Sequence, residues 1–115
     1  MALTREFRET VLARVERDPR FRAALFTEAL NAYLEGDIAT GKAMLRDLVN
    51  ATVGFEGLAR ATGRPAKSLH RMLAAHGNPS SAAFFEIVRA LQAGTRMRLR
   101  VEADEGRNSR RKPAA

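Results

Sequence analysis

The chain has 115 residues, enough for one domain around a single hydrophobic core but too few for two independent cores of ordinary stability. Hydrophobic residues make up 45% and charged residues 29%, a balance typical of a folded globular domain rather than a disordered chain. The sequence has no cysteine, which excludes disulfides and thiolate-bound zinc. Its first residues mix charged and apolar side chains, unlike a secretory signal, and no run is apolar enough to span a membrane. We therefore expect a cytoplasmic protein.

The net charge of +7 is unevenly distributed along the chain. Residues 1–54 are neutral overall, residues 55–102 carry +5, and residues 103–115 carry +2. A basic region attracts polyanions and raises the rate at which they are encountered. A net positive charge can also serve only to keep a small protein soluble. Here all of the excess lies in the C-terminal half of the chain, which favours nucleic acid as the partner.

The first half of the chain predicts three amphipathic helices. Apolar residues recur every four positions in the first of them. Asp18 followed by Pro19 is typical of a helix start, because the carboxylate accepts a free amide and proline needs no acceptor there. This second helix is expected to end at Gly36, and Asp37 to cap a third. The side chains expected to face the core are Leu3, Phe7, Val11 and Val15, then Phe21, Leu25, Phe26, Ala29, Leu30, Tyr33 and Leu34, then Ile38, Leu45, Leu48 and Val49.

The second half predicts three more helices. A short helix over residues 55–62 precedes Gly63, and a helix from Ala66 to about Ala75 follows it. The loop 76–79 stops that helix. Ser80 or Ser81 is expected to cap the last helix, and Gly94 to end it. The expected core positions are Phe55, Leu58, Ala59, Leu69, Met72, Leu73, Phe84, Ile87, Val88 and Leu91.

Beyond Gly94 the apolar period changes from about four residues to two. Met97, Leu99 and Val101 alternate with charged residues, which predicts a short strand. Because a lone strand needs a partner edge, we expect it to pair with the same strand of a second subunit in a homodimer. Residues 103–115 have no apolar period and predict a disordered basic tail, whose cations are at most auxiliary.

Residues 55–75 fulfil three requirements of a helix-turn-helix. The small residue Ala59 suits a close crossing of two short helices. Gly63 tolerates the positive φ of the turn. With Leu69 and Met72 turned inward, the opposite face presents Ala66, Lys67, His70 and Arg71. Lysine and arginine on that face can donate hydrogen bonds to guanine or to phosphates.

The segment LRDLVNATVGFEGLARATGRPAKSLHRMLAAHGNPSSAAFFEIVRAL resembles the addiction-module antidote proteins, helix-turn-helix regulators related to antitoxins of type II toxin-antitoxin systems. The resemblance extends from about Asp18 to Val101. Its most specific parts are Gly36-Asp37, residues 67–73 and residues 77–79. It implies an all-α fold, a compact bundle of about six helices containing a helix-turn-helix like that of lambda repressor.

The resemblance also implies a transcriptional regulator that binds operator DNA through the major groove, and possible binding of a toxin protein. It places base contacts at Ala66, Lys67 and Arg71, and Pro65 and Ser68 near phosphates. Arg64 departs from the small apolar turn residue that is common in such repressors. With the flanking cations included, the expected DNA-binding residues are Arg64, Pro65, Ala66, Lys67, Ser68, His70 and Arg71. Residues 1–54 would be a helical extension packed on the same core as residues 55–102.

Other functions find less support in the sequence. His70 and His76, the two histidines, lack carboxylates at metal-site or triad spacing, so we expect no enzyme, metal or cofactor. Structured RNA binding is disfavoured because most aromatic residues lie on predicted core faces rather than on a stacking platform. The alternative is a protein-interaction module in which residues 1–50 bind a partner such as a toxin and DNA binding is accessory.

Overall fold

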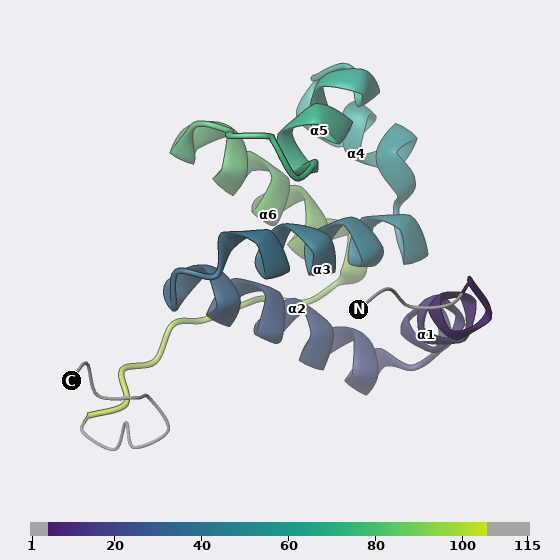
Figure 1. Cartoon of the computed structure of the whole chain (residues 1–115), viewed down its shortest axis with the longest axis vertical. Helices are drawn as coiled ribbons and strands as arrows, with labels where there is room; N and C mark the ends of the chain where they lie inside the picture. The colour runs from purple at the N-terminus through teal and green to yellow at the C-terminus, as the bar shows by residue number, and fades with distance from the viewer. Residues whose placement is uncertain (1–4, 106–115) are drawn as a thin grey trace.

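The computed structural model describes residues 5–105, and this part of the chain contains six α-helices and no β-strand (Figure 1). The all-α fold class and the number of helices are therefore as predicted. The helices are α1 (Arg5–Arg17), α2 (Pro19–Leu34), α3 (Ile38–Ala51), α4 (Gly54–Thr62), α5 (Ala66–Leu73) and α6 (Ser81–Thr95).

Three of the helices begin at polar side chains that the sequence marks as caps. The Asp18 carboxylate accepts hydrogen bonds from the amides of Arg20 and Phe21 at 3.0 and 3.3 Å. Asp37 accepts from the Thr40 amide at 3.3 Å, and the Ser80 hydroxyl from the Ala83 amide at 3.1 Å. Each contact satisfies an amide that has no carbonyl partner within its own helix, so the starts of α2, α3 and α6 are fixed locally.

Helix α3 occupies the centre of the bundle. It runs beside α2 in the opposite direction, and α1 packs against both of them (Figure 1). On its other side α3 contacts α4 and α5, while α6 packs against α4. The placement of α5 therefore depends on α3 and α4.

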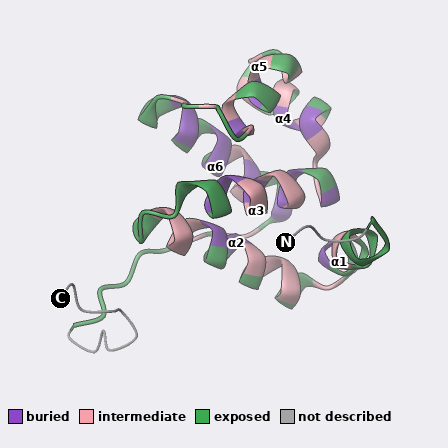
Figure 2. Cartoon of the chain, in the orientation of Figure 1, coloured by how far each residue is buried: buried purple, intermediate pink, exposed green. Residues whose placement is uncertain are grey.

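One cluster of buried side chains joins all six helices (Figure 2). Both halves of the chain contribute to it, so residues 5–54 and 55–102 share a core instead of forming separate ones. The larger members that are wholly buried are Val15, Phe26, Leu45, Leu48, Val49, Leu58, Leu69, Leu73, Ile87 and Leu91.

The structure corrects the predicted C-terminal strand. Within the described residues Met97 to Val101 form no strand. The side-chain oxygen of Gln92 accepts a hydrogen bond from the Leu99 amide at 2.8 Å, and Met97 and Leu99 lie half-buried on the core. Within the single chain the segment thus finds its partners on α6 and the core. Residues 103–105 are exposed, and the rest of the predicted tail lies outside the described residues.

Three predictions at helix ends are wrong. Leu34 and Ile38, expected to face the core, are 73% and 43% exposed, because they lie where α2 ends and α3 begins and no other element covers them. Helix α6 continues through Gly94, and Arg96 takes the left-handed conformation at its end, with φ of 60°. In the first apolar stripe, Phe7 is 53% exposed instead of facing the core, and Leu3 lies outside the described residues.

The burial of Leu69 leads to a stability prediction. Leu69→Ala should lower the free energy of unfolding by about 2 to 5 kcal/mol, because it opens a cavity in a fully packed core. Urea unfolding measures the change. Leu34→Ala is the matched control: its side chain is exposed, so the change should be within about 0.5 kcal/mol. Equal losses for both variants would contradict the described burial of α5.

Candidate nucleic-acid interface

A tight turn connects α4 to α5. Gly63 ends α4 in the left-handed conformation, with φ of 76°, and its amide donates to the Ala59 carbonyl at 2.8 Å. The Thr62 hydroxyl oxygen accepts from the Arg64 amide at 3.2 Å. Because a residue with a Cβ rarely adopts this φ, the glycine sets the direction in which the chain enters α5.

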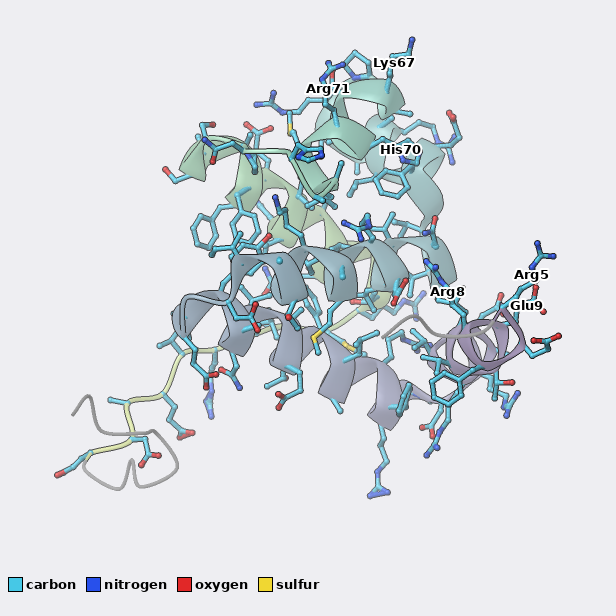
Figure 3. The ribbon with its side chains drawn as sticks, viewed as in Figure 1. Arg5, Arg8, Glu9, Lys67, His70 and Arg71 are labelled. Atoms are coloured by element: carbon cyan, nitrogen blue, oxygen red, sulfur yellow. The ribbon has the colours of Figure 1, made fainter. Side chains whose placement is uncertain are left out.

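Helix α5 has one buried side and one exposed side. Leu69 and Leu73 are fully buried in the core, whereas Lys67, His70 and Arg71 are exposed. Figure 3 shows Lys67 and Arg71 on the outer side of α5, pointing away from the bundle. The predicted separation is confirmed for Leu69 on the inner side and for Lys67, His70 and Arg71 on the outer side, but Ala66, expected on the outer side, packs against the core. The exposed side has cations and no carboxylate from α5 itself, so it presents positive charge to solvent.

The ring of Phe55 on α4 holds His70. The two ring centroids lie 3.8 Å apart and the planes are inclined by 19°, a stacked arrangement. The buried ring of Phe55 covers one face of the His70 imidazole, and the rest of the His70 side chain is exposed to solvent. Stacking restricts the rotamers of His70 and fixes its place beside Lys67 and Arg71.

The remaining expected site residues differ in accessibility. Pro65 is exposed, but Ala66 and Ser68 are half-buried, and Ala66 packs against the core. Arg64 forms an ion pair with Glu86 of α6, with 2.7 Å between its Nε and the carboxylate. Of the seven expected residues, Lys67, His70 and Arg71 therefore form the open face of α5, to which Lys67 and Arg71 give positive charge and which we call the cationic face, and Arg64 is already paired within the protein.

Two cations that reach this region from α3 are not among the residues predicted from the sequence. The Lys42 ammonium group donates to the carbonyls of Ala75 and Gly77 at 3.1 and 2.7 Å. Arg46, one turn further on, donates to the carbonyl of Leu73 at the end of α5. Their four-residue spacing places them on one side of a helix, a signal in the sequence, but nothing local indicates which carbonyls they reach.

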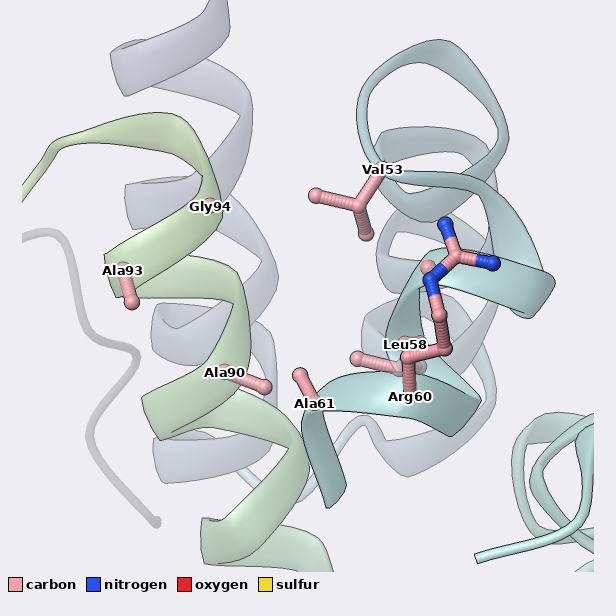
Figure 4. Close-up of a pocket in the computed structure, with 8 residues that line it drawn as sticks. Val53, Leu58, Arg60, Ala61, Ala90, Ala93 and Gly94 are labelled. Carbon is pink, nitrogen blue, oxygen red and sulfur yellow. The ribbon is translucent and has the colours of Figure 1, made fainter. Parts of the chain in front are cut away.

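Other surfaces offer less to a ligand. A hollow between α4 and α6 has a lining of mostly small apolar side chains, with Arg60 as its charged member, and contains none of the expected site residues (Figure 4). Arg5, Arg8 and Glu9 lie on α1, well apart from Lys67 in Figure 3, and Arg8 pairs with Asp47 at 3.2 Å. Within residues 5–105, no group of histidine and carboxylate side chains is arranged to hold a metal ion.

No helix in the described part of the chain has the length and apolar character needed to cross a membrane. Comparisons with known proteins add no relative: no protein-family model, curated protein or solved structure matches the chain.

The Arg64–Glu86 pair leads to a prediction about pH. The hydrogen bond and the nearby positive charge of Arg64 lower the pKa of Glu86 below its ordinary value of 4.5. A carboxyl group whose pKa is lowered by folding stabilises the folded state when the pH is above the ordinary pKa. This stabilisation is lost as the pH falls through the lowered pKa of the folded state. An NMR titration of the Glu86 carboxyl should show the lowered midpoint, and Arg64→Met should move it back toward 4.5. An unchanged midpoint in that variant would mean that the pair does not persist in solution.

Proposed function

We propose that this protein is a DNA-binding transcriptional regulator of the helix-turn-helix class, similar to antitoxins, with α4 and α5 as the motif and α5 as the helix that enters the major groove. The single observation that carries the proposal is the outward face of α5, where Lys67, His70 and Arg71 are exposed opposite Leu69 and Leu73.

The geometry of this face suits the major groove. Lys67 and Arg71 are one helical turn apart, so both can meet the same stretch of duplex. Arginine can donate two hydrogen bonds to guanine, and lysine can bind guanine or a phosphate. The N-cap residue Pro65 supplies no side-chain acceptor, which leaves amides of the first turn of α5 for a phosphate oxygen.

We further propose that the protein acts as a homodimer on an operator with paired half-sites, as regulators of this class do. Selection of bound sites from random duplex DNA tests binding, sequence preference and half-site symmetry together. Recovery of no enriched sequence would reject sequence-specific regulation, and enrichment of a single unpaired site would reject the dimer.

Substitution of the outward cations tests the role of α5. Lys67→Ala and Arg71→Ala should each weaken binding to the selected duplex by about 1 to 3 kcal/mol, because each removes a base or phosphate contact. Both side chains are exposed, so the free energy of unfolding should change by less than about 0.5 kcal/mol. Fluorescence anisotropy gives the affinity and urea unfolding the stability. Arg20→Ala, an exposed cation of α2, is the control and should bind as the unchanged protein does.

A second candidate function is a protein-interaction module, a toxin-neutralising antidote in which DNA binding is accessory. The observation that favours it is a set of large apolar side chains left exposed. Leu34 is 73%, Ile38 43% and Phe85 58% exposed, at the end of α2, the start of α3 and the second turn of α6. The rings of Tyr33 and Phe84 lie 4.5 Å apart, so these helix ends are neighbours. Exposed apolar side chains that gather in one region often mark a contact with another protein.

The interaction candidate has its own test. If a reading frame directly beside this one encodes a toxin, co-expression should yield a complex. The double substitution Leu34→Ser and Ile38→Ser should weaken that complex by at least tenfold, because two apolar side chains would no longer be buried against the toxin. Lys67→Ala should leave that complex unchanged. Isothermal titration measures both affinities. A complex insensitive to the double substitution would exclude this surface, whatever the outcome for DNA.

A further inference from the structure

The carboxyl end of α5 needs hydrogen-bond donors that its own sequence does not provide. The last carbonyls of any helix have no partner within it, and many helices recruit the amides of a left-handed glycine for this purpose. Here the C-cap residue is Ala74 in an extended conformation, with φ of −76° and ψ of 163°. Helix α5 has only eight residues, too few to be stable alone, so its end depends on contacts from elsewhere.

Arg46 of α3 provides a donor to the last residue of α5, and Lys42 of α3 provides donors to the loop that follows it; we call the pair the α3 clamp. Lys42 is only 4% exposed and donates to the carbonyls of Ala75 and Gly77. Arg46 donates to the carbonyl of Leu73. Neither cation has a carboxylate partner within residues 5–105. Positive charge at the negative end of a helix dipole is favourable, and charged donors make stronger hydrogen bonds than neutral ones.

Gly77 brings the following loop within reach of the clamp. A Cβ atom at this position would lie 2.1 Å from the Arg71 carbonyl oxygen and 2.4 Å from that of Met72. No other amino acid fits so close to a helix end without displacing the backbone. The loop therefore lies directly against α5, and its carbonyl faces the ammonium group of Lys42 at 2.7 Å.

We propose that Lys42 and Arg46 are positioning residues of the DNA interface, which fix the orientation of α5 on the bundle although neither touches DNA. The inference rests on the proposed function of α5. The buried Leu69 and Leu73 hold α5 to the core but without directional preference. Hydrogen bonds from two points of α3 to Leu73 and to the loop after it add direction, so the helix cannot rotate or slide without breaking partly buried, charged hydrogen bonds. Lys67 and Arg71 are thereby presented together.

The test compares a clamp variant with a contact variant on the duplex selected above. Lys42→Met keeps the length of the side chain and removes its donors. At a temperature where the protein remains folded, it should bind about tenfold more weakly, the effect of one charged hydrogen bond. The slope of log Kd against log salt concentration should stay unchanged, since no phosphate contact is lost. Lys67→Met should instead make that slope shallower by about one unit. Arg20→Met controls for the lost charge.

Three results would overturn the proposal: undiminished affinity of folded Lys42→Met, a salt slope that becomes shallower as for Lys67→Met, or failure of Lys42→Arg to recover any affinity. If Lys42→Met does not fold, Arg46→Met replaces it, and its DNA affinity and salt slope are judged in the same way. Arg46 is only half-buried, so its substitution disturbs folding less.

Amide hydrogen exchange separates the clamp from the proposed function. In the clamp variants the amides of α5 should exchange at least tenfold faster while those of α2 keep their protection. Absence of DNA binding by the unchanged protein would reject the proposed function. Hydrogen exchange would still test the clamp contacts, because this measurement needs no DNA. Unaltered exchange in α5 would reject the clamp.

Discussion

The burial of one side of α5 is the constraint on which the rest of the structure depends. An eight-residue helix is stable only against a larger body, and Leu69 and Leu73 attach this one to a core that all six helices share. Once those leucines are inside, the helical period leaves Lys67, His70 and Arg71 outside. Gly63 and the stacked ring of Phe55 then determine how α5 leaves α4. The outward cations are thus a consequence of core packing.

Cations of similar chemistry serve different purposes in this fold. Lys42 comes from the half of the chain that is neutral overall, yet it lies buried against carbonyls of the loop that follows α5. Arg64 belongs to the strongly basic half, yet Glu86 already pairs with it. Lys67 and Arg71 keep their charge at the surface. Net charge along the sequence predicts attraction of a polyanion, but which cations are open to one depends on what each side chain contacts in the folded chain.

The two candidate functions draw on different parts of the surface. The cationic face belongs to α5, whereas the exposed apolar residues Leu34, Ile38 and Phe85 come from α2, α3 and α6. Helix α3 connects the two regions, since Ile38 lies in its first turn and Lys42 and Arg46 lie further along it. A partner that binds Leu34 and Ile38 would therefore contact the same helix that holds α5. Because the two surfaces are separate, the two roles can coexist in one chain.

The sequence alone determined the helices, the ends fixed by local contacts and the sidedness of α5. Asp18, Asp37 and Ser80 cap amides two or three residues away, and Gly63 needs only its own φ, so these features require no knowledge of the fold. Contacts between distant segments were decided by the tertiary structure, among them the bonds from Lys42 to a loop 33 and 35 residues later and the Arg64–Glu86 pair across 22 residues. The tertiary structure also decided the exposure of Leu34 and the absence of a strand within residues 97–101. A periodic apolar pattern states which side chains could be covered, but coverage requires another element at that place, and only the packing of the whole chain supplies it.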